Sequence, residues 1–120
     1  MKVIIAGGRK FDDYKILKRE VLFIMDNLDI SEIVSGVANG ADKLGERFAN
    51  EFGIPIKRFP ANWQKLGRSA GYKRNAEMAA YADALIAFWD GKSKGTKHMI
   101  DLAKNKNLKV TVITYDNWRF

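Results

Sequence analysis

Three short glycine-bearing segments contain the residue types that bind anions. They are residues 7–9, 35–42 and 90–96, and each follows an apolar stretch that is typical of a buried β-strand. Small residues let backbone N–H groups close on an anion, and a helix that begins behind such a turn adds unpaired N–H donors and the positive end of its dipole. Three such segments in a chain of 120 residues predict a site for a phosphorylated, nucleotide-derived small molecule.

The second of these segments is the most informative. Ser35, Gly36 and Gly40 suit a tight anion cradle, and Asn39 is placed to cap the following helix or to donate a hydrogen bond. Asp42 lies in the first turn of that helix, where a carboxylate stabilises the dipole by roughly 0.3–1 kcal/mol. Its functional alternative is to accept from a ribose hydroxyl or to act as a general base. The segment matches neither G-x-G-x-x-G nor the Walker pattern, which argues against an ordinary ATPase.

The first segment joins two glycines to an arginine. Gly7 and Gly8 permit close approach of a ligand, and Arg9 can make a paired contact with a phosphate. The alternative is a plain turn from strand to helix with an exposed arginine. Asp12 or Asp13 is expected to cap the next helix rather than to act as an acid or base.

The third segment is a second turn of phosphate size that leads into a helix. Its small and hydroxyl-bearing residues are Gly91, Ser93, Gly95 and Thr96. Asp90 is placed to accept from a sugar hydroxyl or to hold Lys92 by its charge. His98, the sole histidine, has no carboxylate or second histidine at ligand spacing. We therefore expect it on a helix surface, and we expect no metal site.

A tryptophan and several basic residues occupy the long connection that we expect at residues 60–71 and the helix behind it. Trp63, with Arg68 nearby, can stack on a base, a contact worth ~1–3 kcal/mol, or can cover the edge of the core. Arg74 and Asn75 begin the following helix, from which a guanidinium can reach a phosphate or a leaving group in the same crevice.

Together these residues define one candidate site. Its predicted catalytic residues are Arg74 and Asp42. Its predicted ligand-binding residues are Gly7, Gly8, Arg9, Ser35, Gly36, Asn39, Gly40, Ala41, Asp42, Trp63, Gly71, Arg74, Asn75, Asp90, Gly91, Ser93, Gly95 and Thr96. No cofactor is certain from the residues beyond the nucleotide-derived ligand itself.

The amino-acid composition restricts the classes of partner and the cellular compartment that we expect. A count of 21 Lys and Arg against 14 Asp and Glu makes the net charge +7, which favours an anionic partner without choosing between a nucleotide and a nucleic acid. The absence of cysteine excludes disulfides, thiolate zinc sites and cysteine nucleophiles. No apolar run approaches the ~20 residues that span a bilayer, and the N-terminal stretch lacks the length and cleavage site of a signal peptide. We therefore expect a cytoplasmic protein without membrane contact.

Alternating strand and helix patterns predict the elements that position these residues. We expect strands at residues 3–6, 32–35, 54–59, 83–89 and 109–114, helices at 12–28, 41–52, 72–81 and 96–104, an irregular connection at 60–71 and a tail at 115–120. This alternation predicts an α/β fold, namely a single Rossmann-like three-layer domain over residues 1–120 with a mainly parallel five-stranded sheet of order 3-2-1-4-5. The glycine-bearing segments then fall at the carboxyl edge of the sheet, where its order reverses and open sheets bind ligands.

Four motifs in order along residues 2–114 resemble those of the SLOG superfamily, the Rossmann-like group that includes the Smf/DprA proteins and the Lonely Guy phosphoribohydrolases. The similarity is greatest to its small YspA-like branch of bacterial and phage proteins. The motifs are Gly7-Gly8-Arg9-x-Phe11-x-Asp13, Ser35-Gly36-x-x-x-Gly40-Ala41-Asp42, Ala61-x-Trp63 with Ala70-Gly71-x-x-Arg74-Asn75-x-x-Met78, and Ala82-Asp83-Ala84 followed by Gly91-x-Ser93-x-Gly95-Thr96.

This resemblance implies a nucleotide or nucleotide-derived ligand in the crevice and, since superfamily members commonly pair, a homodimer. In Lonely Guy enzymes an Arg before an apolar strand and a Glu three residues after Gly-Thr cleave an N-glycosidic bond. Arg74 stands at the position of that Arg, whereas Met99, which cannot act as an acid or base, stands at the position of the Glu, so that Asp42 or Asp90 would have to substitute for it. The leading hypothesis is therefore a binder, sensor or processor of an ADP-ribose-like or NAD-like compound or a nucleoside phosphate. The alternatives are an N-glycosidic phosphoribohydrolase and a nucleic-acid-binding protein.

Overall fold

The computed structural model describes residues 1–115, which form a parallel five-stranded sheet flanked by helices. The strands are β1 (Lys2–Gly7), β2 (Glu32–Ser35), β3 (Ile56–Arg58), β4 (Ala84–Trp89) and β5 (Lys109–Thr114). The helices are α1 (Tyr14–Met25), α2 (Ala41–Phe52), α3 (Trp63–Leu66), α4 (Ser69–Tyr81) and α5 (Lys94–Asn105). The strand order β3-β2-β1-β4-β5 confirms the predicted α/β fold and its reversal beside β1. Of the expected tail, residues 116–120 lie outside the described residues.

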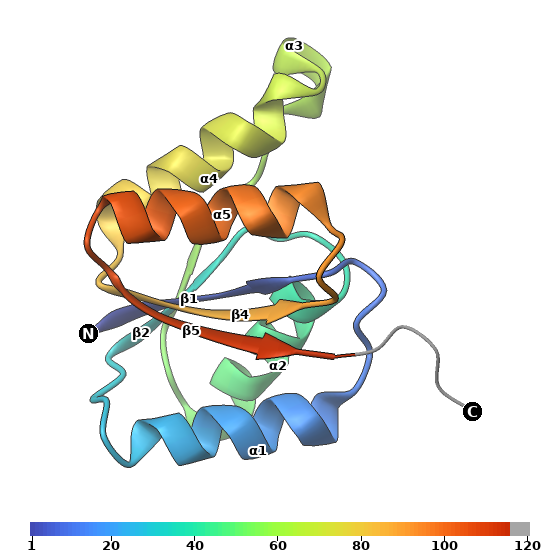
Figure 1. Ribbon diagram of the computed structural model, residues 1–120. Coiled ribbons are helices and arrows are strands. Elements are labelled where there is room, and N and C mark those ends of the chain that lie inside the picture. Colours follow the sequence, from blue (N-terminus) through green and yellow to red (C-terminus); the bar gives the residue numbers. More distant parts are fainter. Residues whose placement is uncertain (116–120) are drawn as a thin grey trace.

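Helices cover both faces of the sheet, with α1 and α2 on one side and α4 and α5 on the other (Figure 1). Successive residues of β1 alternate between the two cores that result. Val3 and Ile5 pack with Leu17 in the core on the side of α1 and α2, whereas Ile4 packs with Met78 in the core on the side of α4 and α5. Because both faces are buried, the central strands are continuously apolar rather than alternating.

The connection between β3 and α4 is more regular than the sequence predicted. The segment at 60–71 was expected to be irregular, but it contains α3 and the first turn of α4. The Asn62 side chain accepts a hydrogen bond from the Lys65 N–H at 3.1 Å and so caps α3, and Gly67, with φ of +57°, ends it. Gly71 lies within α4, and Trp63 packs over it: a Cβ at Gly71 would lie 3.2 Å from the indole ring.

The starts of two other helices show how capping side chains set their bounds. Asp13 caps α1 through a hydrogen bond from the Ile16 N–H, as expected. Helix α5 begins at Lys94, two residues before the predicted start, because Ser93 is its N-cap and accepts from the Thr96 N–H. This earlier start brings the first turn of α5 to the carboxyl edge of β4.

Candidate functional site

A cavity of about 320 Å³ opens at the carboxyl edge of the sheet. Its walls come from the end of β1, the first turns of α2 and α5, and one face of α4. The predicted site residues that line it are Gly7, Arg9, Asp42, Trp63, Gly71, Arg74, Asn75, Ser93, Gly95 and Thr96. The structure therefore brings together residues from all three glycine-bearing segments and from α3 and α4, and the side chains of Met78 and Met99 add apolar wall.

A second cavity of about 350 Å³ adjoins the first. The two share Arg9, Ala38, Trp63 and Arg74. The second cavity is otherwise lined by the loop of residues 36–39 and by the chain that follows β3. Among the predicted site residues, Gly36 and Asn39 line this second cavity alone.

The remaining predicted site residues line neither of these cavities. They are Gly8, Ser35, Gly40, Ala41, Asp90 and Gly91. The Gly8 carbonyl accepts from the N–H groups of Phe11 and Ala41, so it ties the first segment to the start of α2. Gly40 has φ of +81°, and a Cβ there would lie 2.2 Å from the Gly8 oxygen, so this position requires glycine for the contact between the two loops.

The third segment is held by its own aspartate. A side-chain oxygen of Asp90 accepts from the N–H groups of Lys92 and Ser93, both at 2.8 Å. Gly91, with φ of +82°, lies at the exposed tip of the resulting turn. Asp90 therefore shapes the turn that presents Ser93 and Gly95 to the cavity.

Asp42 and Arg74 approach each other around Gly36. Asp42 is 5% exposed, and its Oδ2 accepts from the Ala38 N–H at 3.2 Å. Arg74 donates through Nη1 to the Gly36 carbonyl and through Nε to Asn75 Oδ1. A Cβ at Gly36 would lie 2.7 Å from Asp42 Oδ2 and 2.8 Å from Arg74 Nη1. A side chain at this position would therefore displace the ends of the Asp42 and Arg74 side chains.

Burial perturbs both groups. Desolvation raises the pKa of Asp42 from 3.8 to about 6, although the Ala38 N–H and the charges of Arg74 and Arg9 oppose the rise, while the charge of Glu46 adds to it. Desolvation also lowers the pKa of Arg74; the Asp42 charge opposes this effect and the Arg9 charge reinforces it. Asp42 can thus exchange a proton near neutral pH, which is the property required of a general acid or base.

The loop of residues 36–39 already uses two of its backbone donors. The Val37 N–H donates to Ser35 Oγ at 3.1 Å, and the Ala38 N–H donates to Asp42. The Asp42 carboxylate therefore uses one of the backbone donors of this loop. Val37 has φ of +65°, a left-handed conformation that a β-branched residue rarely adopts and that marks many functional loops.

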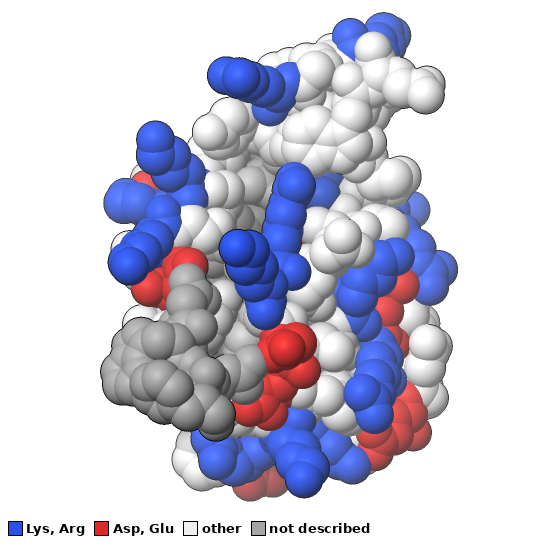
Figure 2. All heavy atoms as spheres, turned by 90° about the vertical axis from the view of Figure 1, so that its right-hand side faces the viewer, with Lys and Arg blue, Asp and Glu red and all other residues white. Residues whose placement is uncertain are grey.

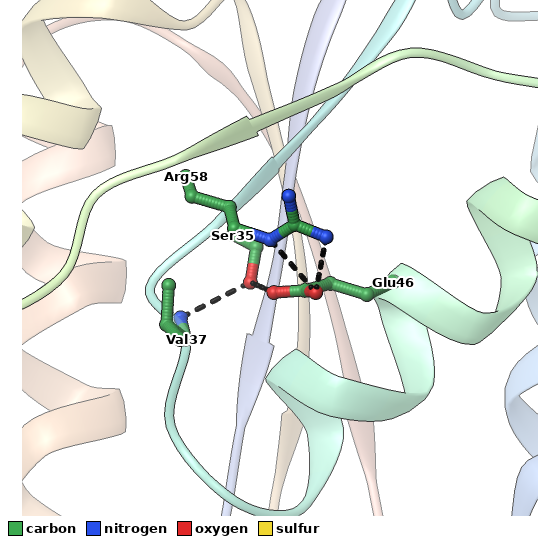
Figure 3. A network of polar contacts seen from close by, with 4 residues as sticks. All are labelled: Ser35, Val37, Glu46 and Arg58. Carbon is green, nitrogen blue, oxygen red and sulfur yellow. Dashed lines mark hydrogen bonds and ion pairs between the residues drawn. The ribbon is translucent and has the colours of Figure 1, made fainter.

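A network behind this loop holds it in place (Figure 3). Ser35 Oγ donates to Glu46 Oε2 at 2.6 Å, and Arg58 donates through Nε to Glu46 Oε1 at 3.0 Å and forms an ion pair with the same oxygen through Nη2, also at 3.0 Å. Glu46 is 8% exposed, so its charge is compensated by these donors rather than by water. The sequence analysis did not identify Glu46 or Arg58. The spacing of Glu46, one helical turn after Asp42 on α2, was the available signal.

The wall formed by α3 and α4 carries aromatic and cationic groups. Trp63 is 48% exposed, and the Arg9 guanidinium lies 5.5 Å from the centre of one of its rings. Arg68 and Tyr72 also line the first cavity, and neither was in the predicted site. Residues 68, 71, 72, 75 and 78 share one helix face. A helix predicted to begin before residue 72 would therefore have placed Arg68 and Tyr72 beside the predicted site residues.

Asn75 joins this wall to α5. It is 6% exposed, and its Nδ2 donates to the Gly95 carbonyl at 3.3 Å and lies 3.2 Å from His98 Nδ1. His98, expected on a helix surface, is half-buried and packs edge-on against the Tyr72 ring. Desolvation lowers its pKa, and the Asp101 charge opposes this.

At this edge of the molecule, Lys and Arg side chains stand in the middle and on both sides, and a group of Asp and Glu lies directly below those in the middle, with further Lys and Arg beneath it (Figure 2). Within residues 1–115, no group of three or more His, Asp and Glu residues is placed to hold a metal ion. In the same part of the chain, no helix is long and apolar enough to cross a membrane.

Comparison with known proteins identifies a family and a relative of this chain. A family model described as YAcAr (YspA, cpYpsA-related SLOG family) matches residues 1–66, which include the first two glycine-bearing segments and Trp63. The chain is also 36% identical over 119 residues to the Gene 61 protein of Mycobacterium phage D29, an alignment that covers 91% of this chain and 93% of the phage protein.

Proposed function

The chain belongs to the YspA, cpYpsA-related SLOG family, and from this premise we propose that it binds a phosphorylated, nucleotide-derived small molecule in the first cavity. The ligand class is that of nucleoside phosphates and of ADP-ribose-like or NAD-like compounds. One observation carries the proposal: three guanidinium groups, those of Arg9, Arg68 and Arg74, line a cavity whose walls also contain the aromatic rings of Trp63 and Tyr72.

Each part of such a ligand has a matching wall. Guanidinium groups bind phosphate through charge-assisted, paired hydrogen bonds. The rings of Trp63 and Tyr72, both 48% exposed, offer faces on which a base can stack. The first turn of α5, at Gly95, adds backbone N–H groups and the positive end of a helix dipole. These contacts together support a ligand that has both a flat ring and a phosphate.

The test is calorimetric titration with AMP, ADP-ribose, NAD and a cyclic dinucleotide. We expect binding of at least one of them, weakened about 10- to 100-fold in Arg74→Ala, because a lost hydrogen bond to a charged group costs about 1.5–3 kcal/mol. Arg19→Ala is the matched control, since Arg19 lies on exposed α1 and its removal changes the net charge equally. Absence of binding to every compound by folded protein would contradict the proposal.

A nucleic acid is the competing partner that the net charge of +7 favours. A single-stranded oligonucleotide therefore belongs in the same titration series at two salt concentrations. An oligonucleotide that binds more tightly than every nucleotide, with an affinity that falls steeply with salt, would replace the small-molecule proposal.

A second candidate function is hydrolysis of an N-glycosidic bond, and the proximity of Asp42 to Arg74 favours it. In this reaction the ionised Asp42 carboxylate takes a proton from water as the water oxygen forms a bond to the anomeric carbon. The bond to the base nitrogen breaks, and the base leaves with the electron pair. The departing base then takes a proton from a water molecule that Arg74 orients. Met99 lines the cavity and cannot supply the acid or base that Lonely Guy enzymes place there, so Asp42 must take that role.

Chromatographic detection of free base tests this candidate. We expect release of base from a nucleoside monophosphate by the wild type, and loss of release in Asp42→Asn and in Arg74→Ala. Turnover that survives both substitutions would remove the mechanism, whereas binding without any turnover would leave the binding proposal as the function.

A further inference from the structure

The first and second cavities share a wall, and this geometry constrains the shape of the ligand. Arg9, Ala38, Trp63 and Arg74 line both of them. Building on the proposed function, we propose that the ligand consists of two organic groups joined through a pyrophosphate. One group occupies each cavity, and the pyrophosphate lies between them at Arg9 and Arg74.

The shared wall carries two positive charges at one place. The charge of Arg9 acts on Arg74 and disfavours its protonated form, so the two guanidinium groups repel each other. An anion between them converts this repulsion into two attractions. A pyrophosphate that links two groups carries two negative charges, one for each arginine, and guanidinium binds such oxygens in pairs. The Arg9 guanidinium also lies over the Trp63 ring, 5.5 Å from its centre, so Trp63 contributes a cation–π contact at the shared wall.

The two cavities differ in chemistry. In the first, the side chains of Tyr72, Met78 and Met99 line the same cavity as the polar residues Asn75 and Thr96, a combination that suits a flat base with a hydrogen-bonding edge. Apart from the wall that it shares with the first cavity, the second is lined by Gly36, Val37, Asn39, Pro60 and Ala61.

Because these residues include no aromatic side chain, this part of the second cavity suits a sugar rather than a second aromatic base. A mononucleotide in the first cavity reaches the shared arginines with its phosphate and ends there, so it leaves the second cavity empty. A pyrophosphate-linked nucleoside and sugar fills both.

Titration with AMP and ADP-ribose under identical conditions tests the inference. We expect ADP-ribose to bind on the order of 100-fold more tightly than AMP, since its second group adds contacts without a second loss of free motion. Two blocking variants assign the cavities. Ala61→Trp fills the second cavity alone, and Gly95→Leu fills the first, where no atom lies within 4 Å of the added Cβ.

Ala61→Trp should reduce the affinity for ADP-ribose to that for AMP and leave the affinity for AMP unchanged, whereas Gly95→Leu should weaken both ligands. Should Ala61→Trp fail to fold, Asn39→Trp blocks the same cavity from an exposed position. Two results would overturn the two-cavity ligand but leave the proposed function standing. One is that the wild type binds AMP and ADP-ribose with equal affinity. The other is that neither blocking variant of the second cavity lowers the affinity for ADP-ribose. Failure of folded wild type to bind either compound would instead overturn the proposed function itself.

Discussion

Asp42→Asn should make the protein more stable at neutral pH, although it removes a group from the candidate site. Asp42 is 5% exposed, and burial raises its pKa from 3.8 to about 6. At neutral pH the folded protein therefore holds a carboxylate that has lost most of its hydration. Asparagine is isosteric, carries no charge, and keeps an oxygen that can accept from the Ala38 N–H.

The sign follows from the direction of the shift. A raised pKa means that the folded state binds the proton more readily than the unfolded state, so the stabilising contribution is complete below about pH 3.8 and is lost as the pH rises through about 6. At about 1.36 kcal/mol for each pKa unit, the ionised carboxylate costs roughly 3 kcal/mol at pH 7. Because Asp42 is almost fully buried, solvent screening reduces this figure little.

Urea unfolding of wild type and Asp42→Asn between about pH 4 and pH 8 measures the effect. The free-energy difference between the two proteins should be small at the acid end and should grow to roughly 3 kcal/mol in favour of the variant above pH 6. Using the difference cancels the titration of the other carboxylates. Asp101→Asn is the matched control, because Asp101 is exposed and its pKa is lowered by Lys97, so its pH dependence has the opposite sign. A variant that is less stable than wild type at pH 7, or a pH-independent difference, would refute the reasoning.

Two further substitutions probe the loop of residues 36–39. Gly36→Ala should destabilise the protein by about 1–3 kcal/mol in urea unfolding, because its Cβ would lie under 3 Å from two charged side chains. Gly95→Ala is the control, because its Cβ meets nothing within 4 Å and its helical position favours alanine. It should leave the free energy of unfolding unchanged or raise it by up to about 1 kcal/mol. Equal losses of stability in the two variants would rule out the crowding argument. Val37→Asn should raise the melting temperature, because asparagine tolerates φ of +65° better than a β-branched residue, and a lower melting temperature would show that packing of the valine matters more.

The sheet and the location of the site followed from local patterns. Continuous apolar strands that alternate with amphipathic helices leave few chain paths, and right-handed crossovers reduce them further, so the order β3-β2-β1-β4-β5 was predictable. The carboxyl edge then collects every strand-to-helix turn. This is why residues as distant as Gly7, Arg74 and Gly95 line one cavity.

The features that were not predictable depend on contacts between distant parts of the chain. Gly71 was placed at the end of an irregular connection, whereas it lies within α4 in contact with Trp63, and its local sequence does not indicate that contact. The ion pair between Glu46 and Arg58 joins α2 to the edge strand β3, and the local sequence around either residue does not indicate it. The left-handed conformation of Val37 contradicts its local preference and exists because the surrounding loop imposes it.

Several features that cost stability converge at this one edge of the sheet. A buried carboxylate at Asp42, two mutually repelling arginines and a left-handed Val37 each oppose folding, and the Ser35–Glu46 hydrogen bond helps to hold the loop that contains them. Strain and unfavourable charge are concentrated at this edge rather than spread over the surface. Such a concentration is typical of a region selected for binding or chemistry instead of stability. An anionic ligand at the arginines relieves their repulsion, but its negative charge offsets the positive charges that favour the Asp42 carboxylate and so raises the pKa of Asp42 further. Ligand binding should therefore be coupled to proton uptake at Asp42, and the affinity for an anionic ligand should fall as Asp42 ionises.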